Sequence, residues 1–171
     1  MSGSILVAYG SKYGATAEIA ETVGEVLRKH GHSVEVRTAG DVRDVRDVSS
    51  FDAVVLGGAL YAGRWHREAR RFARRHRKAL AVRPLWLFSS GPLDTSATER
   101  EVPVAPGVQR VIRLLDAREH VTFGGRLDEN ADGRMARMIV KSGKGGDFRD
   151  FGVISAWAEK IARDPVLGSQ P

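Results

Sequence analysis

Five short segments typical of β-strands, separated by segments with helical periodicity, constrain this chain more than any other feature of its sequence. Three of them, at residues 5–9, 53–58 and 85–88, are apolar or glycine at every position, as strands covered on both faces must be. Residues 33–38 and 120–124 supply two further strands. The amphipathic segments cover residues 14–29, 64–78, 106–115 and 153–161.

This alternation predicts an α/β fold, a doubly wound five-stranded parallel sheet with helices on both faces, because right-handed crossovers place helices on either side. The 171 residues suit one domain, expected at residues 1–164 with residues 165–171 as a C-terminal tail. An Asp-Val-Arg repeat at residues 41–48 predicts a helical turn. Ligands of such folds bind at the carboxyl ends of the strands, so the loops there are the candidate sites.

Composition limits the chemistry. The absence of cysteine excludes disulfides, thiolate metal sites and cysteine nucleophiles, and it fits a cytoplasmic protein. His30 and His32 are too few for a metal centre, so we expect no metal. No apolar run approaches the ~20 residues that cross a bilayer.

The net charge of +6 is concentrated in one segment. Residues 64–78 hold eight basic residues and one acid, and the other 19 basic and 20 acidic residues nearly cancel. A solvated helix face is the default interpretation of such a charge run. The functional alternatives are attraction of an acidic substrate and peripheral contact with an anionic membrane at its inner face. The apolar stripe expected on this helix comprises Trp65, Ala69, Phe72, Ala73, His76 and Leu80.

The loop after the first strand has the composition of a phosphate cradle. Small and hydroxyl residues lead into a helix whose first N–H groups and dipole favour an anion. The spacing of the glycines matches neither a dinucleotide fingerprint nor a P-loop, and the alternative is a turn with a capping hydroxyl. The loop consists of Ser11, Lys12, Tyr13, Gly14, Ala15 and Thr16.

Two further loops can hold a planar ring. Glycines after the third strand permit close approach of a flat ligand, and two aromatic residues there can pack on it. The alternatives are that Trp65 anchors the next helix, that Tyr61 is a surface residue and that the second loop is an ordinary turn. With the phosphate cradle, the loops indicate a mononucleotide site, most simply for FMN. Their candidate residues are Gly58, Ala59, Leu60, Tyr61, Ala62, Gly63 and Trp65 after the third strand, and Ser89, Ser90, Gly91 and Pro92 after the fourth.

The pattern Ser11-x-Tyr13-Gly14-x-Thr16 resembles the phosphate loop of flavodoxin-like proteins, and the resemblance extends over nearly the whole chain. Within that fold the chain is most similar to the menaquinone-dependent protoporphyrinogen IX dehydrogenase group, on residues 61–66, residues 141–147 and the last helix with Trp157. The resemblance implies FMN and oxidation of protoporphyrinogen IX with a quinone acceptor, a late step of haem biosynthesis. Residues 125–150 are expected to form an irregular excursion that is basic and glycine-rich. Its residues 127–136 depart from that group, because the excursion is shorter and less aromatic there.

Three functional hypotheses follow. The first is an FMN-dependent oxidoreductase acting on a porphyrinogen or a quinone. The second is a flavodoxin-type electron carrier or a quinone reductase. The third is a non-catalytic module that binds anions through the arginine-rich segment, although a nearly neutral remainder argues against nucleic acid. His66 is the one titratable candidate for a catalytic role, with helix capping as its alternative.

Overall fold

The computed structural model describes residues 3–11, 14–61, 63–91, 104–127, 146–147 and 149–168. Five parallel strands form its main sheet in the order β2-β1-β3-β5-β6. The strand order reverses between β1 and β3, which is the switch point of a doubly wound sheet. The predicted five-stranded parallel sheet is confirmed. The strands are β1 (Ser4–Gly10), β2 (Ser33–Thr38), β3 (Ala53–Tyr61), β5 (Leu85–Ser90) and β6 (Glu119–Phe123).

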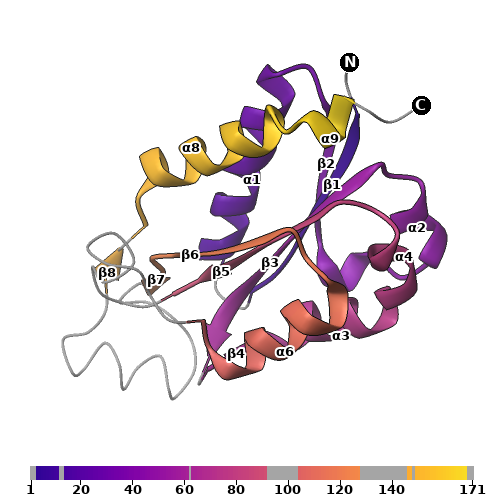
Figure 1. Ribbon diagram of the computed structural model, residues 1–171. Helices are drawn as coiled ribbons and strands as arrows, with labels where there is room; N and C mark the ends of the chain where they lie inside the picture. The colour runs from indigo at the N-terminus through magenta and orange to yellow at the C-terminus, as the bar shows by residue number, and fades with distance from the viewer. Residues whose placement is uncertain are drawn as a thin grey trace.

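Helices cover both faces of this sheet (Figure 1). α1 (Ala15–Lys29) and α8 (Phe151–Ala162) pack on one face. α3 (Arg67–Arg75), α4 (Arg77–Ala81) and α6 (Pro106–Leu115) pack on the other. Successive side chains of a strand point to opposite faces. Strand β1 therefore sends Ile5 and Val7 into one core and Leu6 and Ala8 into the other, which explains its unbroken apolar sequence.

The prediction of a single helix over residues 64–78 is wrong in two respects: the helix begins later, and the segment contains two helices. Arg64 and Trp65 form a short strand, β4 (Arg64–Trp65), which pairs antiparallel with the end of β3. Helix α3 begins only at Arg67, and His76 separates it from α4. The buried ring of His76 lies 3.1 Å, through Nε2, from the carbonyl oxygen of Val42. The expected apolar stripe is nevertheless buried along its whole length.

The connecting segments are shorter than the main elements. A 3-10 turn η1 (Ala39–Asp41) precedes α2 (Val45–Ser49), so the helical turn predicted from the Asp-Val-Arg repeat is confirmed. Asp44 and Asp47 close the start of α2 as a capping box. The segment expected as a C-terminal tail begins with helix α9 (Pro165–Gly168), and its Leu167 is buried against the core.

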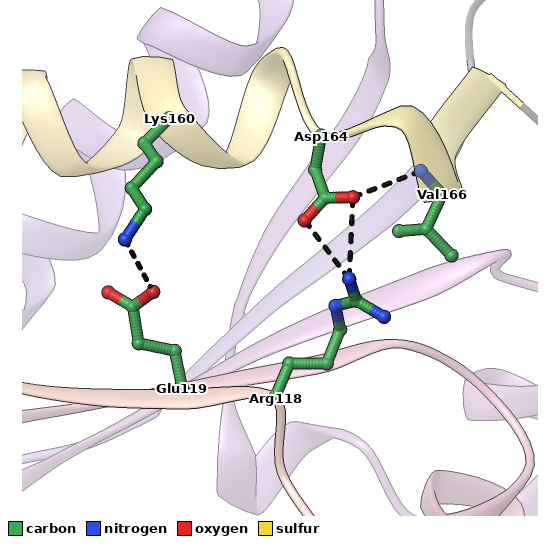
Figure 2. Close-up of polar contacts among 5 residues, drawn as sticks. All are labelled: Arg118, Glu119, Lys160, Asp164 and Val166. Carbon is green, nitrogen blue, oxygen red and sulfur yellow. Dashed lines mark hydrogen bonds and ion pairs between the residues drawn. The ribbon is translucent and has the colours of Figure 1, made fainter.

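Polar contacts fasten α8 and the turn after it to the edge strand β6 (Figure 2). Trp157 Nε1 and Lys160 Nζ donate to the two carboxylate oxygens of Glu119, at 2.8 and 2.9 Å. Arg118 donates to Asp164 at 3.3 Å, and the same carboxylate accepts the backbone N–H of Val166. The C-terminal segment is thereby held on the α1 side of the sheet.

The segment between β6 and α8 is described only in part. Strands β7 (Arg126–Leu127) and β8 (Gly146–Asp147) pair antiparallel within the expected excursion of residues 125–150. Most of residues 127–136 and most of residues 141–147, on which the resemblance partly rests, lie outside the described residues. No helix in the described part of the chain is long and apolar enough to cross a membrane.

Candidate functional site

The sheet register brings the three predicted loops to one edge. Gly10 pairs with Gly58, and Gly58 pairs with Ser89, so the carboxyl ends of β1, β3 and β5 lie side by side. A Cβ built on Gly91 would lie 3.3 Å from the Cβ of Leu60, which places the loops after β3 and β5 in contact. One ligand can therefore touch all three loops, as the crevice at a topological switch point allows.

The start of α1 has the features of an anion site. Gly14 occupies the N-cap position in the left-handed region, at φ 80°, and within the described residues no side chain caps the helix. Thr16 is fully buried, yet its Oγ1 has no hydrogen-bond partner. Buried hydroxyls are normally bonded, and an unsatisfied one costs about 1–3 kcal/mol. Ala15 is also buried and Ser11 half-buried, whereas Lys12 and Tyr13 lie outside the described residues.

An arginine near this helix start was not found from the sequence. Arg149 Nη1 donates to the carbonyl oxygen of Ala15 at 3.3 Å and to Glu18 Oε2 at 2.9 Å. Its side chain is 3% exposed, so the guanidinium is packed against the first turn of α1. No local pattern signals this contact, because Arg149 lies near the end of the expected excursion of residues 125–150 and meets α1 through the tertiary fold.

The loop after β3 is a tight hairpin. Tyr61 pairs with Arg64 across residues 62–63, and Gly63 takes the positive φ, 76°, that such a turn requires. The half-buried Tyr61 ring lies 6.0 Å from the His66 ring, edge-on. Ala59 is buried and Leu60 half-buried, whereas Ala62 lies outside the described residues. Tyr61 is thus the aromatic residue of this loop that keeps surface for a ring.

The expectation that Trp65 packs on a ring is wrong. Trp65 is 1% exposed and donates its Nε1–H to Ser89 Oγ at 2.8 Å. A Cβ on Gly58 would lie 2.5 Å from the indole Cγ, so the indole fills the space beside Gly58. Trp65 therefore anchors the hairpin to the sheet. Because the Ser89 side chain is also 1% exposed, its hydroxyl belongs to this core and does not face a ligand.

A second polar residue missed in the sequence completes that buried contact. His120 Nε2 lies 2.8 Å from Ser89 Oγ. The hydroxyl oxygen accepts from Trp65, and its hydrogen bond with His120 takes its direction from the tautomer of the imidazole. Burial lowers the pKa of His120 to about 4, so the imidazole is neutral near pH 7. The sequence did offer one sign of this buried contact, since His120 is a titratable residue within a predicted strand.

The remaining candidates have structural contacts. His66 is the N-cap of α3, where its Nδ1 accepts the N–H of Glu68 at 3.3 Å. The structure thus agrees with helix capping, the alternative to a catalytic role for His66. Gly91 donates its N–H to the carbonyl oxygen of Phe123 at 2.9 Å and has φ 134°. Ser90 is buried beside it, and Pro92 lies outside the described residues.

The model of the flavodoxin domain family matches residues 6–146. This chain belongs to the flavodoxin family. A flavodoxin of Nitratidesulfovibrio vulgaris (strain DSM 19637 / Miyazaki F) is 44% identical over 54 residues, 32% of this chain and 36% of that relative. The match thus spans about a third of the curated relative's length.

Solved structures repeat the fold over almost the whole chain. A variant of the flavodoxin from Pseudomonas aeruginosa superposes with a TM-score of 0.63 at 14% identity, covering 97% of this chain and 99% of that one. The rubredoxin oxygen:oxidoreductase from Desulfovibrio gigas gives a TM-score of 0.61 at 12% identity, covering 94% of this chain and 35% of that one. At these identities the likeness is one of fold.

Flavodoxins bind FMN, the cofactor predicted from the three loops. The described residues fit it. The unsatisfied hydroxyl of Thr16 and the uncapped start of α1 offer donors to a phosphate. Leu60, Tyr61 and Gly91 lie on the adjoining loops, where they would border the ring.

Proposed function

We propose that this protein is a flavodoxin-type electron carrier with its FMN held at the carboxyl ends of β1, β3 and β5. The observation that carries the proposal is the buried, unsatisfied hydroxyl of Thr16 at the same sheet edge as Tyr61 and Gly91. Bound FMN supplies reversible electron transfer, and the protein supplies binding and orientation.

The side chains around the site favour a carrier over an enzyme that handles protons of a bound substrate. His66 is occupied as a helix cap. His120 is bonded behind the loop, to the buried hydroxyl of Ser89. Among the described residues of the site, no carboxylate or histidine is placed as a general acid or base, whereas electron transfer through a flavin needs none.

Flavin content and redox behaviour test the proposal. Purified protein, reconstituted with FMN and freed of excess cofactor, should contain about one FMN per chain. It should be reduced by dithionite and reoxidised by ferricyanide through repeated cycles. Protein that remains colourless after reconstitution would overturn the proposal.

A second candidate function is oxidation of protoporphyrinogen IX with a quinone acceptor. The observation in its favour is that Arg64 and Arg67 lie exposed just beyond Tyr61, where they can attract the propionate groups of a porphyrinogen. An anaerobic assay with protoporphyrinogen IX and menadione separates the candidates. Porphyrin fluorescence that rises with enzyme concentration supports the dehydrogenase, and its absence in FMN-loaded protein leaves the carrier.

A further inference from the structure

We propose that the face formed by α3, α4 and α6 is the docking surface for an acidic protein that exchanges electrons with the flavin. This inference rests on the proposed carrier function and names the chemistry of its partner. The surface, called the basic face below, comprises the exposed sides of these three helices together with Arg64 of β4.

The two helical layers differ sharply in charge. The basic face has five arginines in α3, two basic residues in α4 and two arginines in α6, against the single acid Glu68. The helices of the opposite layer, α1 and α8, carry four acids and three basic residues. Because α3, α4 and α6 lie on one side of the sheet (Figure 1), the positive charge of these helices is gathered there.

The two layers also differ in how their charges are paired. On the α1 side, Arg149 bonds Glu18, Lys160 bonds Glu119 and Arg118 bonds Asp164, the last two of which Figure 2 shows. Within the described residues, none of the nine basic side chains of α3, α4 and α6 makes an ion pair. Their charge is available to a partner.

This arrangement is unfavourable for the helix itself. Arg67 and Arg71 are four residues apart, as are Arg71 and Arg75, so like charges face each other along α3. Each such pair destabilises an isolated helix by about 0.2–0.5 kcal/mol. The apolar side of α3, with Ala69, Phe72 and Ala73, holds it in the core. Of the arginines in α3, Arg70 is half-buried and donates its Nε–H to the carbonyl oxygen of Trp65 at 3.0 Å, and the other four are exposed.

The basic face is continuous with the ring side of the site. Arg64 is exposed and pairs with Tyr61 across the hairpin. The start of α6 adjoins the same hairpin, because Gly107 donates its N–H to the Gly63 carbonyl oxygen at 3.3 Å. A protein resting on this face therefore lies beside the edge where the flavin ring is held.

A protein fits this face better than a membrane or a nucleic acid. Phe72 and Trp65, the aromatic residues of α3 and β4, are 2% and 1% exposed and cannot stack on bases or enter a lipid interface. The apolar side of α3 is occupied by the core and cannot insert into a bilayer. Planar guanidinium groups bind carboxylates in a bidentate manner, and long-range attraction accelerates encounters between oppositely charged proteins.

The test compares two variants with equal charge change. R67Q/R71Q removes two charges from the basic face, and K29Q/R163Q removes two from exposed positions outside it. Each protein is loaded with FMN, reduced, and mixed by stopped flow with an oxidised cytochrome that accepts its electrons. The acidic acceptor is cytochrome b5, and the basic acceptor is cytochrome c. At low salt the natural protein should react faster with the acidic probe, and R67Q/R71Q should slow that reaction about fivefold or more. K29Q/R163Q should change it less than about twofold.

Each outcome has one meaning. The docking surface is overturned if the natural protein reacts equally fast with the two cytochromes, or if the two variants slow the reaction with cytochrome b5 equally. In either case, FMN content and reoxidation by ferricyanide still test the carrier function separately. Fluorescence anisotropy without flavin gives a second readout, with labelled poly-L-glutamate, a DNA duplex and phosphatidylserine vesicles as probes. Weaker binding of R67Q/R71Q to polyglutamate supports the proposal. Binding to vesicles or DNA but not to polyglutamate overturns it.

Discussion

Replacing Thr16 by valine should make the flavin-free protein more stable and, at the same time, weaken its binding of FMN. Valine has nearly the same shape as threonine, so the change removes only the hydroxyl that is buried without a partner. In the flavin-free protein an unpaired polar group is replaced by a methyl group, which removes a desolvation penalty. In the FMN-loaded protein, as proposed, the same change would remove a hydrogen-bond donor to the phosphate.

The size of each effect follows from the environment of that hydroxyl. An unsatisfied buried group costs about 1–3 kcal/mol, so the free energy of unfolding of flavin-free T16V should rise by about 1 kcal/mol. Hydrogen bonds to charged groups contribute about 1.5–3 kcal/mol, which corresponds to FMN binding roughly ten- to a hundredfold weaker. Urea unfolding of the flavin-free protein and fluorescence titration with FMN measure the two quantities.

Thr22 provides the control in the same helix. Its hydroxyl donates to the carbonyl oxygen of Glu18 at 2.9 Å, away from the start of α1. T22V should leave FMN affinity within about twofold and stability within about 0.5 kcal/mol. The reasoning is refuted if T16V binds FMN as tightly as T22V does, or if flavin-free T16V is the less stable of the two by more than about 1 kcal/mol.

Four further perturbations test the surroundings of the site, the first of them a change of pH. Because burial lowers the pKa of His120 to about 4, below its usual 6.5, its contribution to stability is complete above pH 6.5 and is lost as the pH falls toward 4. Lowering the pH from about 7.5 to about 5 should cost the natural protein about 2 kcal/mol more than H120Q in urea unfolding, and parallel pH profiles would contradict this. W65F should destabilise the protein by about 1–3 kcal/mol, since it leaves Ser89 without its donor, while FMN affinity stays within about twofold. Y61L should instead weaken FMN binding and leave the stability of the protein nearly unchanged. If W65F lost more FMN affinity than Y61L, the indole of Trp65 would be a contact of the flavin ring after all. G91A should cost about 1–2 kcal/mol in thermal unfolding because alanine strains at φ 134°, and an unchanged melting temperature would contradict that.

The sheet and the placement of its loops could be predicted because their causes are local. Residues 5–9 and 85–88 are continuously apolar since both faces of the sheet are covered, and parallel strands must end at one edge. The loops after β1, β3 and β5 therefore met as expected. Periodicity misled at Trp65, which is buried from a strand but lies four residues before Ala69, the spacing of a helical stripe.

The contacts beneath the site could not be predicted, because they join residues distant in sequence. Ser89 and His120 are 31 residues apart, and Arg149 and Ala15 are 134 apart. The hydroxyl of Thr16 was expected as a donor, but its burial without a partner depends on the packing around α1. Only the fold decides which polar groups are left unsatisfied, and such groups distinguish a ligand site from a turn.

The hairpin after β3 bears on the speed of electron transfer. Its Gly63 carbonyl oxygen accepts from Gly107, and the Ala59 carbonyl oxygen accepts from His66 at 2.8 Å, so it is tied to the starts of two helices. Rotating the Gly63 peptide would break the bond to α6. If FMN is held there as proposed, a change of flavin charge would leave this backbone little freedom to follow, so we expect a small reorganisation energy for the hairpin. The same bond links α6, part of the basic face, to the hairpin beside the proposed flavin position, so a partner docked there would rest on a rigid support.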